Sequence, residues 1–147
     1  MSLNHSEIMK YLRNRPPLLM IDYADEVIPG KFARTVKKLN QDEWFFPCHF
    51  PGNPVMPGVL QVETIFQTAA LAIHTLPENQ DKTTYMSRIK EASFFFSVVP
   101  EDTMYIEATL DTWKRGLGKG SGVIKVNDKI ACKVDYIIVI KECIIKK

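Results

Sequence analysis

The most informative stretch of this chain is residues 49–63, which read His49-Phe50-Pro51-Gly52-Asn53-Pro54-Val55-Met56-Pro57-Gly58-Val59-Leu60-Gln61-Val62-Glu63. It separates one histidine from one carboxylate by fourteen positions and places three prolines and two glycines between them. Proline fixes φ and removes a backbone donor, whereas glycine opens φ values that other residues avoid. Because three prolines at this spacing cannot share one helix, the stretch predicts a stiff loop that holds His49 in a defined place.

A long helix is predicted directly after this loop. Residues 59–76 contain no proline or glycine, and the helix is expected to begin at Pro57 or Gly58 and to stop before Pro77. Proline is tolerated at a helix start because the first helical amides have no partner inside the helix. Apolar residues surround most of the helical wheel, which is typical of a helix buried inside a domain.

Strands are predicted for most of the remaining chain. The segment after Thr83 is rich in β-branched and aromatic residues, with turn signals at residues 100–102 and 127–129. One buried helix followed by antiparallel strands predicts an α+β domain over residues 1–147, in which a curved antiparallel sheet wraps a long central helix. The open edges of such a sheet favour dimerisation. The expected strands are residues 32–39, 85–89, 92–99, 104–113, 120–126 and 130–140, and a short helix is expected over residues 6–12.

Length, composition and charge are those of an ordinary soluble domain. The chain has 147 residues, of which 46% are hydrophobic and 24% charged, and its net charge of +2 implies no nucleic-acid partner. No apolar run reaches the roughly 20 residues of a membrane helix, so no membrane insertion is expected. The three cysteines match no zinc motif and no signal peptide is evident, which indicates a reducing, cytoplasmic setting.

Glu63 is unusual for its position, because it lies about five residues into a helix that is otherwise apolar. A buried carboxylate needs a partner or a purpose. Gln67 lies one turn later on the same face, so the pair predicts a small polar pocket on a buried element. The alternative is an edge carboxylate that is solvated or paired with a lysine. His5 and His74 show no such context and are interpreted as structural or surface residues.

A histidine and a carboxyl group on opposite sides of a substrate can move two protons. His49 would remove a proton from carbon, and Glu63 would deliver one to a departing oxygen, so that water is lost or, in reverse, added. The amides of Gly58 and Val59 would lie unpaired in the first helical turn, at the positive end of the helix dipole. They would hold the negative charge that develops on a thioester carbonyl as the proton leaves.

These residues resemble the 3-hydroxyacyl-[acyl-carrier-protein] dehydratases of fatty-acid synthesis, the FabZ type. The motif of that family, His-Phe-Pro-Gly-x-Pro-(Val/Ile)-Met-Pro-Gly-Val-Leu-x-x-Glu-(x)3-Gln, is met from His49 to Gln67. Residues 15–22, RPPLLMID, are similar to the opening of the family, and residues 98–102, VVPED, to one of its later turns. The resemblance covers most of the chain.

The resemblance implies a hot-dog fold and a homodimer, often stacked as a trimer of dimers, with acyl tunnels at the subunit interface. By this likeness His49 is the catalytic base, and Glu63 of the other subunit is the acid. Gly58 would supply the oxyanion amide, and Gln67 would orient the acid. The substrate would be a (3R)-3-hydroxyacyl thioester, dehydrated to the trans-2-enoyl form, and no metal or redox cofactor is expected. Glutamate at the acid position favours the FabZ type over the dehydratase–isomerases, which carry aspartate there.

Some residues depart from the family pattern, and these departures bear on which molecule carries the thioester substrate. Cys48 and Glu101 stand where the family usually has glycine. Phe95 and Phe96 replace basic residues that are thought to meet the acidic carrier protein. The thioester is therefore expected on acyl carrier protein or on coenzyme A. The rival interpretations are an acyl thioesterase, since one fold can host several activities, and a non-catalytic protein that binds acyl thioesters.

Overall fold

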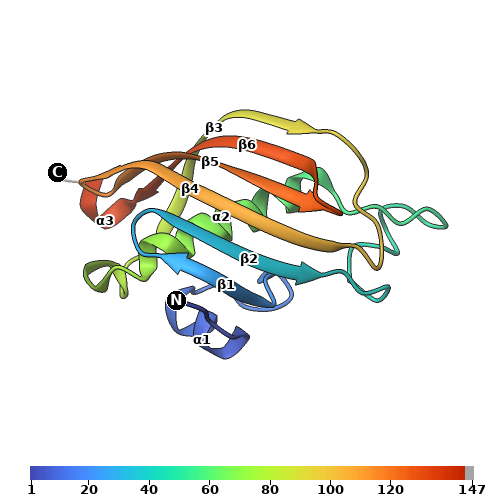
Figure 1. The fold of residues 1–147 in the computed structure, drawn as a ribbon, viewed down its shortest axis with the longest axis horizontal. Helices are drawn as coiled ribbons and strands as arrows, with labels where there is room; N and C mark the ends of the chain where they lie inside the picture. Colours follow the sequence, from blue (N-terminus) through green and yellow to red (C-terminus); the bar gives the residue numbers. More distant parts are fainter. Residues whose placement is uncertain (145–147) are drawn as a thin grey trace.

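One long helix lies against the inner face of a curved, six-stranded antiparallel sheet (Figure 1). The computed structural model describes residues 1–144, and within them no helix is long and apolar enough to cross a membrane. The strands follow one another in the order β1-β2-β4-β5-β6-β3, so β1 and β3 form the two edges. The helices are α1 (His5–Tyr11), α2 (Gly58–His74) and α3 (Lys141–Ile144), with a 3₁₀ turn, η1 (Pro77–Asn79); the strands are β1 (Tyr23–Ile28), β2 (Phe32–Lys38), β3 (Thr84–Phe94), β4 (Thr103–Lys114), β5 (Leu117–Val126) and β6 (Lys129–Ile140).

Helix α2 can lie close to the sheet because β5 carries a glycine, Gly122, where the two meet. Residues 64–74 of the helix are all buried. A Cβ atom on Gly122 would collide with Cγ2 of Ile65. Glycine often marks such a close approach within a strand. The burial of this helix, which the sequence predicts, is confirmed.

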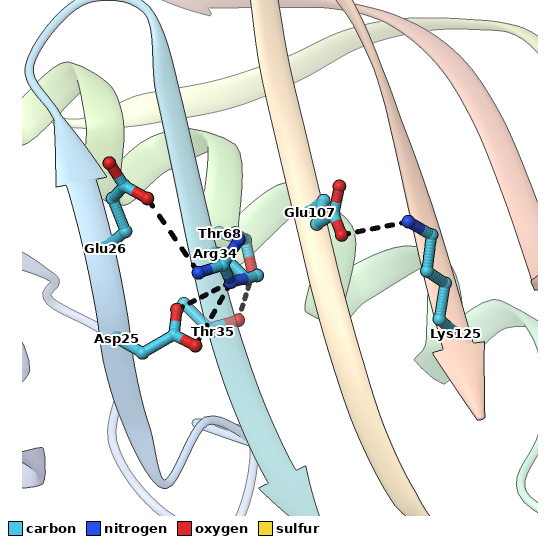
Figure 2. A network of polar contacts seen from close by, with 7 residues as sticks. All are labelled: Asp25, Glu26, Arg34, Thr35, Thr68, Glu107 and Lys125. Carbon is cyan, nitrogen blue, oxygen red and sulfur yellow. Dashed lines mark hydrogen bonds and ion pairs between the residues drawn. The ribbon is translucent and has the colours of Figure 1, made fainter. Parts of the chain in front are cut away.

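Polar contacts join α2 to the sheet and link neighbouring strands on the outer face of the sheet (Figure 2). On the inner side, the hydroxyl groups of Thr35 on β2 and Thr68 on α2 share a buried hydrogen bond of 2.7 Å. On the outer side, Arg34 of β2 pairs with Asp25 of β1 at 2.9 Å, and a second ion pair joins β4 to β5. These ion pairs are partly exposed and contribute little stability, so the apolar contact between α2 and the sheet stabilises the fold more than they do.

His74 closes the end of α2 as a buried structural residue. Its Nδ1 lies 2.8 Å from the carbonyl oxygen of Asn79, and its Nε2 lies 3.2 Å from the hydroxyl group of Thr84. Because a carbonyl only accepts, Nδ1 carries the proton and Nε2 accepts from the hydroxyl. Burial lowers the pKa of His74, which favours this neutral form. The histidine therefore ties the helix end to η1 and β3.

Strand β3 differs from the sequence prediction. The structure has one strand, Thr84–Phe94, where the sequence predicts two, over residues 85–89 and 92–99. The polar residues between the predicted strands stay in the ladder because β3 is an edge strand open to solvent, and two register shifts against β6 accommodate it. Residues 95–99 leave the sheet, and the carbonyl of Val98 accepts from the amide of Met56 at 2.8 Å. Within this segment Val98 is buried beside the loop before α2, whereas Phe95, Phe96 and Val99 are exposed.

We expect Gly122→Ala to destabilise the fold, because the added methyl group meets Ile65 and pushes α2 away from β5. Overpacking of this kind typically costs about 1–3 kcal/mol. Urea unfolding followed by circular dichroism measures the change in the free energy of unfolding. Ser121→Ala, which alters the opposite face of β5, is the matched control and should stay within about 0.5 kcal/mol of the wild-type protein. Equal stability of Gly122→Ala and the wild-type protein would contradict the close contact.

Candidate active site

The loop before α2 presents His49 with one ring nitrogen already engaged. Its Nδ1 lies 2.8 Å from the carbonyl oxygen of Val55. Because a carbonyl only accepts, Nδ1 carries the proton in the neutral ring and Nε2 is left as the basic nitrogen. Two backbone hydrogen bonds of 2.9 Å between Phe50 and Asn53 close the loop, and the Phe50 ring stacks on the imidazole at a centroid distance of 4.1 Å. The ring is thus held in one place and in one tautomer.

The first turn of α2 begins at Gly58 and Val59, directly after Pro57. As first helical residues, they have amides without an acceptor inside the helix. The ring of Phe94 packs on Gly58, since a Cβ atom there would lie 2.9 Å from Cε1 of that ring. Glycine is therefore required at the helix start for this packing. The side chain of Val59 is 76% exposed.

A cavity of about 410 Å³ joins the histidine loop to the start of α2. His49, Gly58 and Gln61 line it from these two elements. The three phenylalanines at residues 94–96 form another wall, and they are 49%, 60% and 38% exposed. A cavity with apolar walls and a few convergent polar groups is typical of a binding site for a small apolar ligand. The remaining lining residues are Val55, Met56 and Ser97.

Gln67 contacts Glu63 and is itself held by the chain before β1. Its Nε2 donates to Oε1 of Glu63 at 3.1 Å and to the carbonyl of Leu18 at 2.8 Å. Its Oε1 accepts from the amide of Met20 at 3.1 Å. Burial raises the pKa of Glu63, and the hydrogen bond from Gln67 opposes this effect. A raised pKa suits a carboxyl group that must keep a proton until it donates it.

Within one chain, Glu63 and His49 do not share the cavity. Glu63 follows Gly58 by five residues, which turns it by about 140° around the helix axis. Among the described residues, the polar side chain that α2 contributes to the cavity wall is Gln61. Gln61 is not among the residues singled out from the sequence, although its place three residues after Gly58 puts it on the same helical face. This cavity of a single chain therefore does not combine His49 with Glu63.

A long central helix wrapped by a curved antiparallel sheet is the hot-dog fold, as predicted from the sequence. The FabA-like domain family matches residues 12–135, and the chain belongs to this family. A curated relative from Ligilactobacillus salivarius (strain UCC118), named "3-hydroxyacyl-[acyl-carrier-protein] dehydratase FabZ", is 41% identical over 138 residues. The matched region covers 94% of this chain and 99% of that relative.

Solved structures share the fold at low sequence identity. The one titled "The Dehydratase Heterocomplex ApeI:P from Xenorhabdus doucetiae" matches with a TM-score of 0.63 and 20% identity, over 78% of this chain and 92% of that chain. A hypothetical thioesterase from Streptococcus pneumoniae TIGR4 with coenzyme A matches with a TM-score of 0.62 and 10% identity, over 80% of this chain and 84% of that chain. At these identities the likeness shows the fold alone, so it does not favour a thioesterase.

We expect Glu63→Gln to stabilise the protein at neutral pH. Burial holds the pKa of Glu63 above its ordinary 4.5, so between these two values the folded state binds more protons than the unfolded state. The stability that Glu63 contributes is therefore present below pH 4.5 and is lost as the pH rises through the raised pKa. Glutamine keeps an acceptor for Gln67 and carries no charge.

Urea unfolding at a series of pH values measures this difference. The advantage of Glu63→Gln over the wild-type protein should be absent below pH 4.5 and should grow as the pH rises above it. Asp25→Asn, which removes a partly exposed carboxylate of an outer ion pair, is the control and should show no such gain. A Glu63→Gln variant that is less stable than the wild-type protein at pH 7 would contradict the burial of this carboxyl group.

Proposed function

We propose that this protein is a hydro-lyase that dehydrates (3R)-3-hydroxyacyl thioesters, linked to acyl carrier protein, to trans-2-enoyl thioesters in fatty-acid or related acyl-chain biosynthesis. One observation carries the proposal: a loop with a pre-oriented histidine meets the start of a helix with unpaired amides at one cavity. The motif from His49 to Gln67 and the 41% identity to a curated dehydratase support the same activity.

In the proposed mechanism, Nε2 of His49 removes a proton from C2 of the substrate. Glu63, in its protonated form, gives its proton to the 3-hydroxyl group, which leaves as water. The C2–H and C3–O bonds break, the C2–C3 double bond forms, and the proton on His49 returns to Glu63 through solvent. Each positioned proton transfer typically contributes about 10²–10⁴-fold to the rate. The carbonyl of Val55 keeps Nε2 available by holding the proton of Nδ1.

The start of α2 stabilises the charge that develops during this reaction. As C2 loses its proton, negative charge moves to the thioester carbonyl, which faces the amides of Gly58 and Val59. These amides lie in the first helical turn, where the dipole is positive. Loss of one such donor commonly costs about 10²–10³-fold in rate. Gln67 supports the acid by its hydrogen bond to Glu63.

The proposed site is shared between the two subunits of a homodimer. The cavity that His49 lines does not include Glu63 of the same chain, so the proposed catalytic pair takes one residue from each chain. The edge strand β3 supports this arrangement, because Tyr85, Ile89 and Phe94 are 49%, 47% and 49% exposed along it. An exposed apolar sheet edge is a site where another chain can pair. A trimer of such dimers is the larger assembly expected from the family resemblance.

The expected carrier of the thioester is acyl carrier protein, and the expected compartment is the cytoplasm. The printed name of the curated relative refers to acyl carrier protein as the carrier of its substrate. Phe95 and Phe96 take the place of basic residues of the family, so the exposed cations proposed to meet an acidic carrier are Arg88, Lys90, Lys114, Arg115 or Lys119. Coenzyme A, which bears the same pantetheine arm, is the alternative carrier. The cytoplasm is the expected location, where free thiols such as that of Cys132 stay reduced.

We expect His49→Gln to lower the dehydration rate by about 10²–10⁴-fold, because glutamine cannot accept the proton from C2. The absorbance of the enoyl thioester measures the reaction, and circular dichroism shows whether the fold is kept. A folded variant with wild-type turnover would remove His49 from the mechanism. Release of free thiol by the wild-type protein without enoyl thioester would instead indicate a thioesterase, and acyl binding without either reaction would indicate a non-catalytic protein.

Mixing two inactive variants tests the shared site. In a dimer of one His49→Ala subunit and one Glu63→Gln subunit, one of the two sites keeps His49 from one chain and Glu63 from the other. Random exchange makes about half of the dimers mixed, so about a quarter of the wild-type activity should return. Size-exclusion chromatography confirms that dimers are present. If base and acid came from the same chain, mixing would restore no activity.

A further inference from the structure

Gln61 is a buried amide for which the proposed reaction has no role. It lies three residues after Gly58 on α2 and is 3% exposed. Its Nε2 donates to the carbonyl oxygen of Met56 at 3.2 Å. Its Oε1 is buried and has no hydrogen-bond partner within residues 1–144. The side chain lines the cavity that also contains His49.

The Nε2 and Oε1 atoms of this amide cannot exchange places. If the amide were turned around, its oxygen would face the carbonyl oxygen of Met56, and neither atom could donate a proton. Met56 is itself well fixed, because it is 1% exposed and its amide donates to the carbonyl of Val98 at 2.8 Å. The orientation of the Gln61 amide, with Oε1 free to accept a hydrogen bond, is therefore fixed before any ligand binds. A buried acceptor without a donor is costly and uncommon, which indicates that a ligand completes it.

A 3-hydroxyacyl thioester offers two donors near its reacting carbons. One is the 3-hydroxyl group, which faces Glu63 in the proposed mechanism. The other is the first amide N–H of the pantetheine arm, which is separated from the thioester sulfur by two methylene groups. In the proposed mechanism the 3-hydroxyl group is taken up by Glu63 of the other subunit, whereas Gln61 shares the helical face of Gly58, whose amide faces the thioester carbonyl. The donor nearest to Gln61 is accordingly the pantetheine amide.

We propose that Oε1 of Gln61 accepts a hydrogen bond from the first amide N–H of the pantetheine arm and makes the enzyme selective for thioesters that carry this amide. The inference rests on the proposed function, because it takes Gly58 as the site of the thioester carbonyl. The walls formed by residues 94–96 supply apolar contact for the methylene groups beside the amide. Acyl carrier protein and coenzyme A share this arm, so the contact recognises the thioester whichever carrier bears it.

Two synthetic substrates test the contact. The N-acetylcysteamine thioester of 3-hydroxybutyrate has the amide N–H, and its S-(2-acetoxyethyl) counterpart has an ester oxygen in the same place. The wild-type enzyme should prefer the amide substrate in kcat/KM by roughly tenfold or more, because the ester leaves the acceptor without a donor. Gln61→Met keeps the length of the side chain but removes the acceptor, so it should lose most of this preference.

Thr64→Val is the matched control on the same helix. It removes a buried hydroxyl group whose partner is the backbone carbonyl of Gln61, and it leaves the Gln61 amide in place. The amide-to-ester ratio of this variant should equal that of the wild-type enzyme. Because the ratio is taken within each variant, partial loss of folded protein or of overall activity cancels. Carrier-linked and coenzyme A-linked substrates both contain the amide, so Gln61→Met should slow both by the same factor, and the wild-type kcat/KM for each identifies the carrier.

Three results would overturn the inference. The first is a wild-type amide-to-ester ratio near one, which needs no variant and is measurable even if Gln61→Met fails to fold. The second is an unchanged ratio in a folded Gln61→Met enzyme, since another group would then recognise the amide. The third is a ratio lost equally in Thr64→Val, which would indicate general damage to α2. Failure of the proposed function looks different, because the wild-type protein would then dehydrate neither thioester.

Discussion

The packing of helix α2 into the curved sheet is the constraint on which the rest of the structure depends. Gly122 on β5 brings the backbone of the sheet against Ile65, in a helix whose residues 64–74 are all buried. This contact fixes the position of the whole helix, including its first turn. The amides of Gly58 and Val59 are thereby held beside the loop that carries His49. The packing of the apolar part of α2 therefore determines where the amides of its first turn lie, and with them the chemistry that the site can perform.

The helical period divides the candidate site residues of α2 between two sides. Gly58 and Gln61 line the cavity of their own chain, whereas Gln67 contacts the segment before β1 and donates a hydrogen bond to Glu63. His49 and Glu63, the proposed base and acid, therefore do not share a cavity within one subunit. A homodimer resolves this separation in the proposed mechanism, and the exposed apolar edge of β3 provides a surface for it. Oligomerisation and catalysis would then have the same structural origin.

Much of the fold can be predicted from local patterns because those patterns act through neighbouring residues. The start of α2 at Gly58 follows from three prolines and a run without helix breakers, and its burial follows from an apolar wheel. The two-strand prediction for residues 85–99 is wrong because apolar composition does not reveal whether a segment pairs in a sheet or covers a loop. Gln61 is equally hard to find from the sequence, since its significance depends on where Met56 and the cavity lie.

The sequence by itself determined the stiff loop around His49, the buried helix that carries Glu63, the α+β class and the family, because spacing, breakers and motif are properties of consecutive residues. Only the tertiary structure decided that Glu63 turns away from the cavity of its own chain, that β3 is an exposed edge and that Gln61 keeps an unpaired acceptor. These features depend on which distant segments pack together. The burial and the hydrogen-bond partners of a side chain depend on that packing, and the packing of distant segments cannot be inferred from a local sequence pattern.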